Sequence, residues 1–281
     1  MHMHLGERIR LTLFGTSHGP RVGALLNGVP AGIGIDTEAI ELAMVSRRPG
    51  GRYASKRREP DIVEFRSGVH DGKTTGEEIE ISIDNKDAKS RDYSFLPAHP
   101  RPGHQDMVMH KRTNGEADLR GGGSSSARLT AALVASAAVL SPLLSQLNVV
   151  CEAQVGAIGQ VEAREMNQCP PRWENEACKE MRCRDPVAAL AMVETVEAHR
   201  MQRNSIGSRV DLQITGLPLG LGEPWFDGLE PALARAMIAI PAARGVTFGR
   251  GFDAVRMTGL EHNDPWGGTA EKPILIGEKP D

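Results

Sequence analysis

The chain of 281 residues is long enough to bury a sizeable hydrophobic core in one large domain or two small ones. Its 40% hydrophobic and 25% charged residues exclude a wholly disordered chain. The formal net charge of -3 and the aromatic content of 4% argue against a nucleic acid as partner, because nucleic-acid-binding proteins present basic surfaces and aromatic stacking platforms.

The first predicted elements are a hairpin and a helix. Residues 8–14 and 22–26 are typical of strands, and the Gly and Pro residues of segment 15–20 predict the turn between them. Asp36 or Thr37 then caps a helix that ends near Arg48, where basic side chains suit the negative end of the helix dipole.

The rest of the chain continues in blocks of strands and helices. Alternating apolar and polar side chains predict strands over 61–68, 78–83, 209–215 and 252–258. Apolar spacing predicts helices from Gly123 to about Gln146, from Pro186 onward with Leu190, Val193 and Val196 inward, and over 229–240. Because helices do not separate the strands one by one, we expect an α+β fold with antiparallel sheets.

Cysteine spacing and apolar patterning bear on the compartment. The four cysteines include no Cys-x-x-Cys pair, which disfavours a zinc site and predicts free thiols in a reducing cytoplasm. No apolar signal segment follows Met1, because charged residues come within the first eight positions. The longest apolar stretch, 129–140, is too short to cross a bilayer. We therefore expect a cytoplasmic protein with no membrane segment.

Two glycine-flanked motifs resemble catalytic signatures only superficially. Gly15-Thr16-Ser17-His18-Gly19 matches the G-x-S-x-G pattern of hydrolases, but a strand follows it where a nucleophile elbow needs a helix. Gly68-Val69-His70-Asp71-Gly72-Lys73-Thr74-Thr75 is one residue short of a phosphate-binding loop, and a strand follows it too. Both motifs are predicted to be hairpin turns. The first places a Ser-His pair at a tip that a ligand can approach.

Three further segments have side chains or backbone groups suited to anions. Six of the twelve residues from Arg47 to Arg58 are Arg or Lys, although a solvated loop also explains that composition. The stretch His99-Pro100-Arg101-Pro102-Gly103-His104 places two imidazoles and a guanidinium in a stiff loop. Segment 120–128 combines Arg, Gly and Ser before a predicted helix, where free amides and hydroxyls can bind phosphate or carboxylate. The three segments together predict a small polyanionic ligand.

In this order, the segments resemble the chorismate synthase family. The resemblance spans about residue 9 to 265, and its motifs are Phe14-Gly15-Thr16-Ser17-His18-Gly19-Pro20, Arg47-Arg48-Pro49-Gly50, Arg57-Arg58-Glu59-Pro60-Asp61, Lys73-Thr74-Thr75-Gly76, Arg101-Pro102-Gly103-His104, Arg120-Gly121-Gly122-Gly123, Ser125-Ser126-Ala127-Arg128, Asn204-Ser205-Ile206-Gly207 and Gly220-Leu221-Gly222-Glu223-Pro224. So many ordered matches make coincidence negligible. The resemblance implies one β-α-β sandwich domain over residues 1–281 and assembly as a homotetramer.

The resemblance also implies a lyase of the shikimate pathway. The family converts 5-enolpyruvylshikimate 3-phosphate to chorismate and phosphate by an anti-1,4-elimination, which needs reduced FMN without net redox change. Such a substrate carries a phosphate and two carboxylates, and planar guanidinium groups pair well with both. Whether the protein reduces its own flavin with NADPH stays open.

Site residues are carried over from the same resemblance. His18 matches the histidine that protonates the leaving phosphate, and His104 matches the histidine near the flavin. The remaining assignments are substrate binding by Ser17, Arg48, Arg101 and Arg128, FMN binding by Ser124, Ser125, Ser126 and Ala242, and NADP binding by Arg47 and Arg52. We expect no metal.

Several positions depart from the family pattern. Thr16 stands where the family usually has Glu, Ser46 where it usually has Arg, and Ser124 where an Arg commonly precedes the Ser-Ser-Ala-Arg motif. The family also continues beyond Asp281 through further flavin and substrate motifs, so we expect the C-terminal part of the family domain to be absent. Two alternatives stay open: a non-catalytic remnant that keeps the anion site, and an RNA-binding protein that uses the basic segments.

Overall fold

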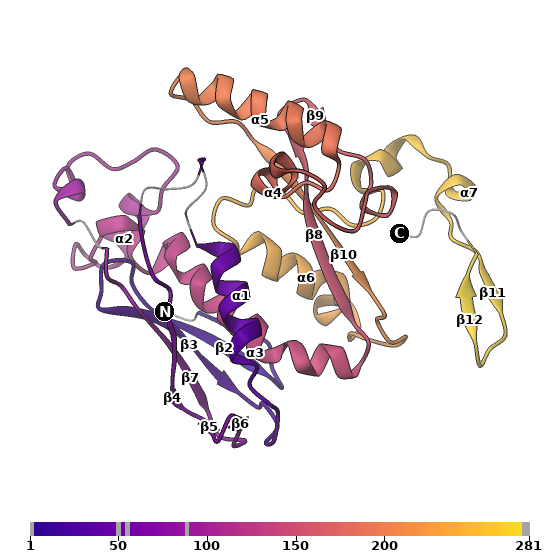
Figure 1. The fold of residues 1–281 in the computed structure, drawn as a ribbon, viewed down its shortest axis with the longest axis horizontal. Helices are drawn as coiled ribbons and strands as arrows, with labels where there is room; N and C mark the ends of the chain where they lie inside the picture. Colours follow the sequence, from indigo (N-terminus) through magenta and orange to yellow (C-terminus); the bar gives the residue numbers. More distant parts are fainter. Residues whose placement is uncertain (1–2, 49–51, 54–56, 88–89, 277–281) are drawn as a thin grey trace.

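The structure is a computed structural model and describes residues 3–48, 52–53, 57–87 and 90–276. These residues form two main antiparallel sheets, each packed against helices (Figure 1). The expected α+β class is therefore confirmed. Parts of the predicted basic loop, residues 49–51 and 54–56, lie outside the described residues.

The first sheet has five strands. Their order is β1 (His4–Leu5), β2 (Arg10–Gly15), β3 (Arg21–Asn27), β7 (Ile79–Asp84) and β4 (Val63–Ser67). All neighbours are antiparallel, and the β2–β3 pair is the predicted first hairpin. The second glycine motif is also a hairpin, formed by β5 (Val69–His70) and β6 (Lys73–Thr74).

Two helices cover this first sheet and close the larger core. Helix α1 (Thr37–Arg47) begins where the Asp36 carboxylate accepts the backbone N–H of Ala39 at 2.9 Å. Helix α3 (Thr130–Gln146) packs against α1, β3 and β7. Two short 3-10 turns and α3 together span Arg120–Gln146, a segment long and apolar enough to cross a membrane by length and composition, but α3 buries its Ala and Val face in this core.

The second sheet has three strands and a core of its own. Its order is β10 (Ser208–Thr215), β8 (Val150–Ile158) and β9 (Val161–Glu162). Helices α4 (Glu176–Met181) and α5 (Pro186–Met201) pack against it, with Cys178, Cys183 and Met192 fully buried. All four cysteines are free thiols.

The inward face of α5 differs from the sequence-based prediction. The helix begins at Pro186 as expected, with Asp185 as its N-cap, but Leu190 is 56% exposed. The buried face consists of Ala188, Ala189 and Met192, with Val193 and Val196 packed partly against the same core. Small alanines let the helix approach β8 closely, so the larger Leu190 falls on the opposite side.

The C-terminal region holds α6 (Leu229–Ile238), α7 (Gly259–His262) and a hairpin of β11 (Trp266–Gly268) and β12 (Pro273–Leu275), drawn in light orange to yellow in Figure 1. The strand predicted over 252–258 is wrong. Residues Gly251–Arg256 form a 3-10 helix in which Phe252 and Val255 are 82% and 86% exposed. The alternation was misleading because the described chain places no partner strand beside this segment.

The buried cap of α5 predicts a pH-dependent stability. Hydrogen bonds from the Arg164 guanidinium at 2.8 Å and from the backbone of Val187 and Ala188 lower the pKa of Asp185 to about 2. A carboxyl group with a depressed folded pKa stabilises the fold above its unfolded pKa, and that stability is lost as the pH falls through the folded value. We expect Asp185→Asn to be about 2 kcal/mol less stable at neutral pH, with the difference disappearing between about pH 4 and pH 2.

Urea unfolding across that pH range measures the effect. Asn keeps the N-cap acceptor for Val187 and Ala188, and the variant removes the charge together with the oxygen that accepts from Arg164. The control is Asp71→Asn, because the Asp71 side chain is 90% exposed. A stability difference that does not change with pH would contradict the assignment.

Candidate active site

Ser17 and His18 lie at the turn between β2 and β3, against the glycine-rich segment Arg120–Ser125. The buried Ser17 hydroxyl donates to the carbonyl oxygen of Arg120 at 3.1 Å, and its Oγ lies 3.0 Å from Nδ1 of His18. The hydroxyl has one proton, which is directed to Arg120, so Nδ1 of His18 is the donor in the second contact. Nε2 is then the ring atom that can accept or release a proton.

The close approach of the two segments requires glycine. Gly121 has a φ of +60°, and a Cβ there would lie 2.5 Å from both Ser17 Oγ and His18 Cε1. The backbone N–H of Ser17 also donates to the carbonyl of Gly123 at 3.1 Å. The expected helix does not start directly after Gly123, because Ser126 is extended and α3 begins at Thr130.

A buried ionic cluster lies beside the tip. The Asp61 carboxylate, fully buried, accepts hydrogen bonds from the guanidinium groups of both Arg47 and Arg128. The Glu59 carboxylate accepts from Arg57 at 2.8 Å, and Arg57 also donates to the carbonyl of Ser17 at 3.0 Å. Three guanidiniums thus share two carboxylates, which gives the cluster one net positive charge, and these ion pairs orient the guanidiniums.

Hydrogen bonds keep Glu59 ionised in this cluster. Burial alone would raise the pKa of its carboxyl group, but the backbone N–H of Lys86 and the guanidinium of Arg57 outweigh burial and lower it. Glu59 therefore stays ionised at neutral pH.

Arg101 and His18 meet at the ring of Tyr93. The Arg101 guanidinium lies 5.3 Å from the Tyr93 ring centroid, and the His18 ring meets Tyr93 edge-on at 5.0 Å. Arg101 is fixed by a bidentate pair with the buried Asp106, at 2.8 and 2.6 Å. These bonds lower the pKa of Asp106 despite its burial.

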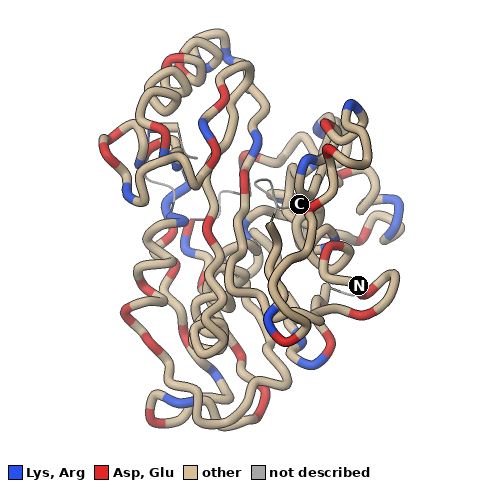
Figure 2. The backbone as a smooth tube through the Cα atoms, turned by 90° about the vertical axis from the view of Figure 1, so that its right-hand side faces the viewer, with Lys and Arg blue, Asp and Glu red and all other residues tan. Residues whose placement is uncertain are grey.

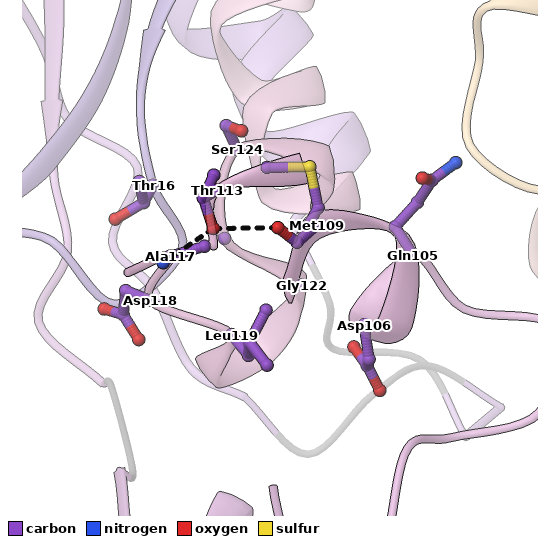
Figure 3. A pocket seen from close by; sticks show the side chains of 11 residues that line it. Thr16, Gln105, Asp106, Met109, Thr113, Ala117, Asp118, Leu119, Gly122 and Ser124 are labelled. Atoms are coloured by element: carbon purple, nitrogen blue, oxygen red, sulfur yellow. Dashed lines mark hydrogen bonds between the residues drawn. The ribbon is translucent and has the colours of Figure 1, made fainter. Parts of the chain in front are cut away.

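A small cavity opens next to the tip (Figure 3). Thr16 from the tip, Met109 from α2 (Asp106–Arg112) and Ser124 from the glycine-rich segment line it, and its volume is about 140 Å³. Thr113 closes one side, with its hydroxyl donating to the carbonyl of Met109 at 2.8 Å. The cavity is smaller than the roughly 300–1,000 Å³ of typical ligand pockets.

The other predicted site residues are more scattered. Arg48 pairs with Glu41 at 2.8 Å, and Arg52 reaches Glu197 on α5 at 3.4 Å. His104 is exposed, with Nδ1 2.9 Å from the carbonyl of Pro102. Ser125 is exposed, Ser126 caps the turn that holds Arg128, and Ala242 is exposed after α6.

Sequence reasoning missed the acidic half of the site. Glu59, Asp61 and Asp106 each hold at least one guanidinium, and they stand inside or just after the basic segments that drew attention. Basic and acidic residues are interspersed along the backbone of the described chain (Figure 2). The available signal was the presence of acidic residues directly after the arginine-rich segments. Burying an arginine is costly unless a carboxylate pairs with it, so such neighbours are its expected partners.

Comparison with known proteins decides the family. The family model described as chorismate synthase matches residues 9–274. The chain belongs to the chorismate synthase family. It is 44% identical to the chorismate synthase of Aeropyrum pernix over 92% of this chain and 69% of that protein. The chorismate synthase of Porphyromonas gingivalis is 43% identical, over 92% of this chain and 71% of that protein.

A solved structure agrees with these relatives. The crystal structure of a chorismate synthase superposes with a TM-score of 0.73 at 25% identity, covering 97% of this chain and 77% of that one. The predictions of the chorismate synthase family, its fold and a carbon–oxygen lyase are confirmed. The comparisons give no support to a non-catalytic remnant.

Proposed function

We propose that the chain eliminates phosphate from 5-enolpyruvylshikimate 3-phosphate at the Ser17–His18 tip, giving chorismate. The observation that carries this placement is the His18 ring, held by Ser17 between the glycine-rich segment and Tyr93, with a cluster of oriented arginines beside it. A dianionic phosphate leaves such a site more readily when a proton donor and guanidinium groups stabilise it.

His18 is the proton donor in this proposal. Its Nδ1 is engaged with Ser17, so the imidazolium releases the proton of Nε2 to the leaving phosphate. Arg101, next to the same ring, binds an anionic group of the substrate, and Ser17 sets the orientation of the imidazole. Arg48 and Arg128 complete the proposed substrate-binding set, the second by shaping the site from its buried position.

The flavin site is proposed on the family resemblance. Members of this family require a reduced flavin, which supplies transient electron transfer to the substrate when bound. We assign FMN to Ser124, Ser125, Ser126 and Ala242, His104 to the flavin environment, and NADPH to Arg47 and Arg52. Ser124 lines the small cavity but Ala242 does not, so these described residues do not by themselves enclose a flavin.

The assembly and compartment are proposed on the same basis. The chain acts on a small molecule, and we propose a cytoplasmic homotetramer with neither nucleic acid nor membrane as partner. We also propose that residues 1–281 act as one domain. Arg182 supports this by donating to the carbonyl of Ser46 at 2.6 Å, which ties the second core to helix α1.

The experiment that tests the function is an anaerobic assay. The purified chain is mixed with chemically reduced FMN and 5-enolpyruvylshikimate 3-phosphate, and chorismate is followed by its absorbance. Turnover supports the proposal. If FMN and substrate both bind by calorimetry but no chorismate forms, the proposed activity of this chain is wrong.

Adding one methyl group at Gly121 tests the placement of the site. In Gly121→Ala, the new Cβ cannot be placed without displacing Ser17 or His18, so we expect turnover to fall about 10- to 100-fold. The control is Gly72→Ala, where φ is +72° and nothing lies within 4 Å of the added Cβ. Both variants place an alanine at a positive φ, but only in Gly121→Ala does the new Cβ collide with Ser17 and His18. Equal turnover in the two variants would place the chemistry elsewhere.

A further inference from the structure

Asn85, the first residue after β7, is bonded to the Ser17–His18 tip through its backbone and its side chain. Its backbone N–H donates to the carbonyl of Pro20 at 2.9 Å. Its side-chain amide donates to the carbonyls of Thr16 at 3.0 Å and Gly19 at 2.8 Å. The two acceptors of the amide stand on either side of Ser17 and His18 in the chain.

We propose that Asn85 is a positioning residue for His18, which fixes the imidazole by holding the backbone before and after it. The inference rests on the proposed role of His18 as proton donor. A hydrogen-bonded carbonyl at each end of a four-residue turn leaves the turn little freedom to rotate. Misplacement of a catalytic group by about 1 Å can cost about a hundredfold in rate.

A buried cation selects the orientation of the Asn85 amide. The Nε of Arg128 donates to Oδ1 of Asn85 at 2.8 Å, and a guanidinium can only donate. The amide oxygen therefore faces Arg128, and both N–H groups of the amide face the tip. Arg128 is itself 6% exposed and is held by Asp61 and by the carbonyl of Asp84 at 3.2 Å.

Only an amide of this length satisfies all of these contacts. An aspartate in place of Asn85 would keep the acceptor for Arg128 but would turn a second oxygen toward the carbonyls of Thr16 and Gly19. Alanine would leave those two carbonyls and the Arg128 Nε without this partner. Asn85→Asp is therefore a nearly isosteric change that removes the donation, and Asn85→Ala removes it without adding a charge.

The first test compares steady-state kinetics with a matched control. We expect Asn85→Asp, which keeps the acceptor for Arg128, to lower kcat about 10- to 100-fold while KM changes less than about twofold, and Asn85→Ala to lower kcat by a similar factor. The control is Asn175→Asp, where the N-cap oxygen of α4 accepts the backbone N–H of Cys178 at 2.8 Å and an aspartate serves equally well. This control keeps its activity.

The second test asks whether Asn85 acts through His18. In the His18→Ala background, Asn85→Asp should cause no further loss, because the group it positions is gone. A KM effect without a kcat effect, or an equal loss with and without His18, would overturn the proposal.

A third measurement needs no activity. Amide hydrogen exchange of Gly19, whose N–H is bonded to Thr16 Oγ1 at 2.9 Å, should be at least about tenfold faster in Asn85→Ala, with β8 unchanged. If the parent chain makes no chorismate, the proposed function fails, and exchange still decides whether Asn85 holds the tip. Unchanged exchange would overturn the inference even in an active enzyme.

Discussion

Replacing His18 with alanine is expected to lower turnover by about 100-fold or more, because a positioned acid contributes about 10²- to 10⁴-fold. Substrate affinity should change little, because the arginines that we propose bind the anionic groups of the substrate keep their own carboxylate partners in this variant. Chorismate formation in a single turnover measures the first effect, and calorimetry with the substrate measures the second.

The control for this variant is His70→Ala. His70 lies on the β5–β6 hairpin, and its side chain is 79% exposed. This variant therefore removes an imidazole that lies outside the candidate site. A parallel loss of affinity and turnover in His18→Ala would mean that His18 binds the substrate and does not transfer a proton.

The largest effect on stability is expected at Asp61. Its fully buried carboxylate joins Arg47 and Arg128, and removing one partner of a buried ion pair leaves an uncompensated charge. We expect Asp61→Asn to lower the free energy of unfolding by about 3–5 kcal/mol, as measured by urea denaturation.

A second aspartate provides a matched control for that variant. Asp61 and Asp71 have positive φ values of 49° and 46°, which Asn tolerates, but only Asp61 is buried. Asp71→Asn should change stability by less than about 0.5 kcal/mol. If Asp61→Asn lowered the free energy of unfolding no more than Asp71→Asn does, the buried ion pairs of Asp61 would not stabilise the fold.

The strands and helices that could be predicted were those with strong local signals. Asp36 and Asp185 start helices at the expected positions, and the alternation over 78–83 corresponds to β7. Segment 252–258 carries the same alternation but folds as a 3-10 helix. A strand also needs a neighbour, and the alternation of a single segment does not specify one.

The roles assigned to the site residues stay a prediction, and only part of the arrangement of these residues could be predicted. Ser17 and Arg101 lie close to His18 and Tyr93, from segments that the motifs had singled out, whereas the hydrogen bonds of Asn85 could not be predicted because their acceptors lie in a turn that is distant in the sequence. The pairing of Arg128 with Asp61 spans 67 positions in the chain. Such long-range pairs follow from the sheet register and not from local sequence.

The pairing of arginines with internal acids also determines how dissolved ions affect this site. An anion that enters the cluster competes with Glu59 and Asp61 for N–H groups that are already engaged. When such an anion binds, it replaces the carboxylates of Glu59 and Asp61 as the partner of the guanidiniums. Few counter-ions are then released into the solvent, because the carboxylates, and not dissolved ions, neutralised the arginines before. Affinity for an anionic ligand should therefore depend less steeply on ionic strength than the number of arginines alone suggests.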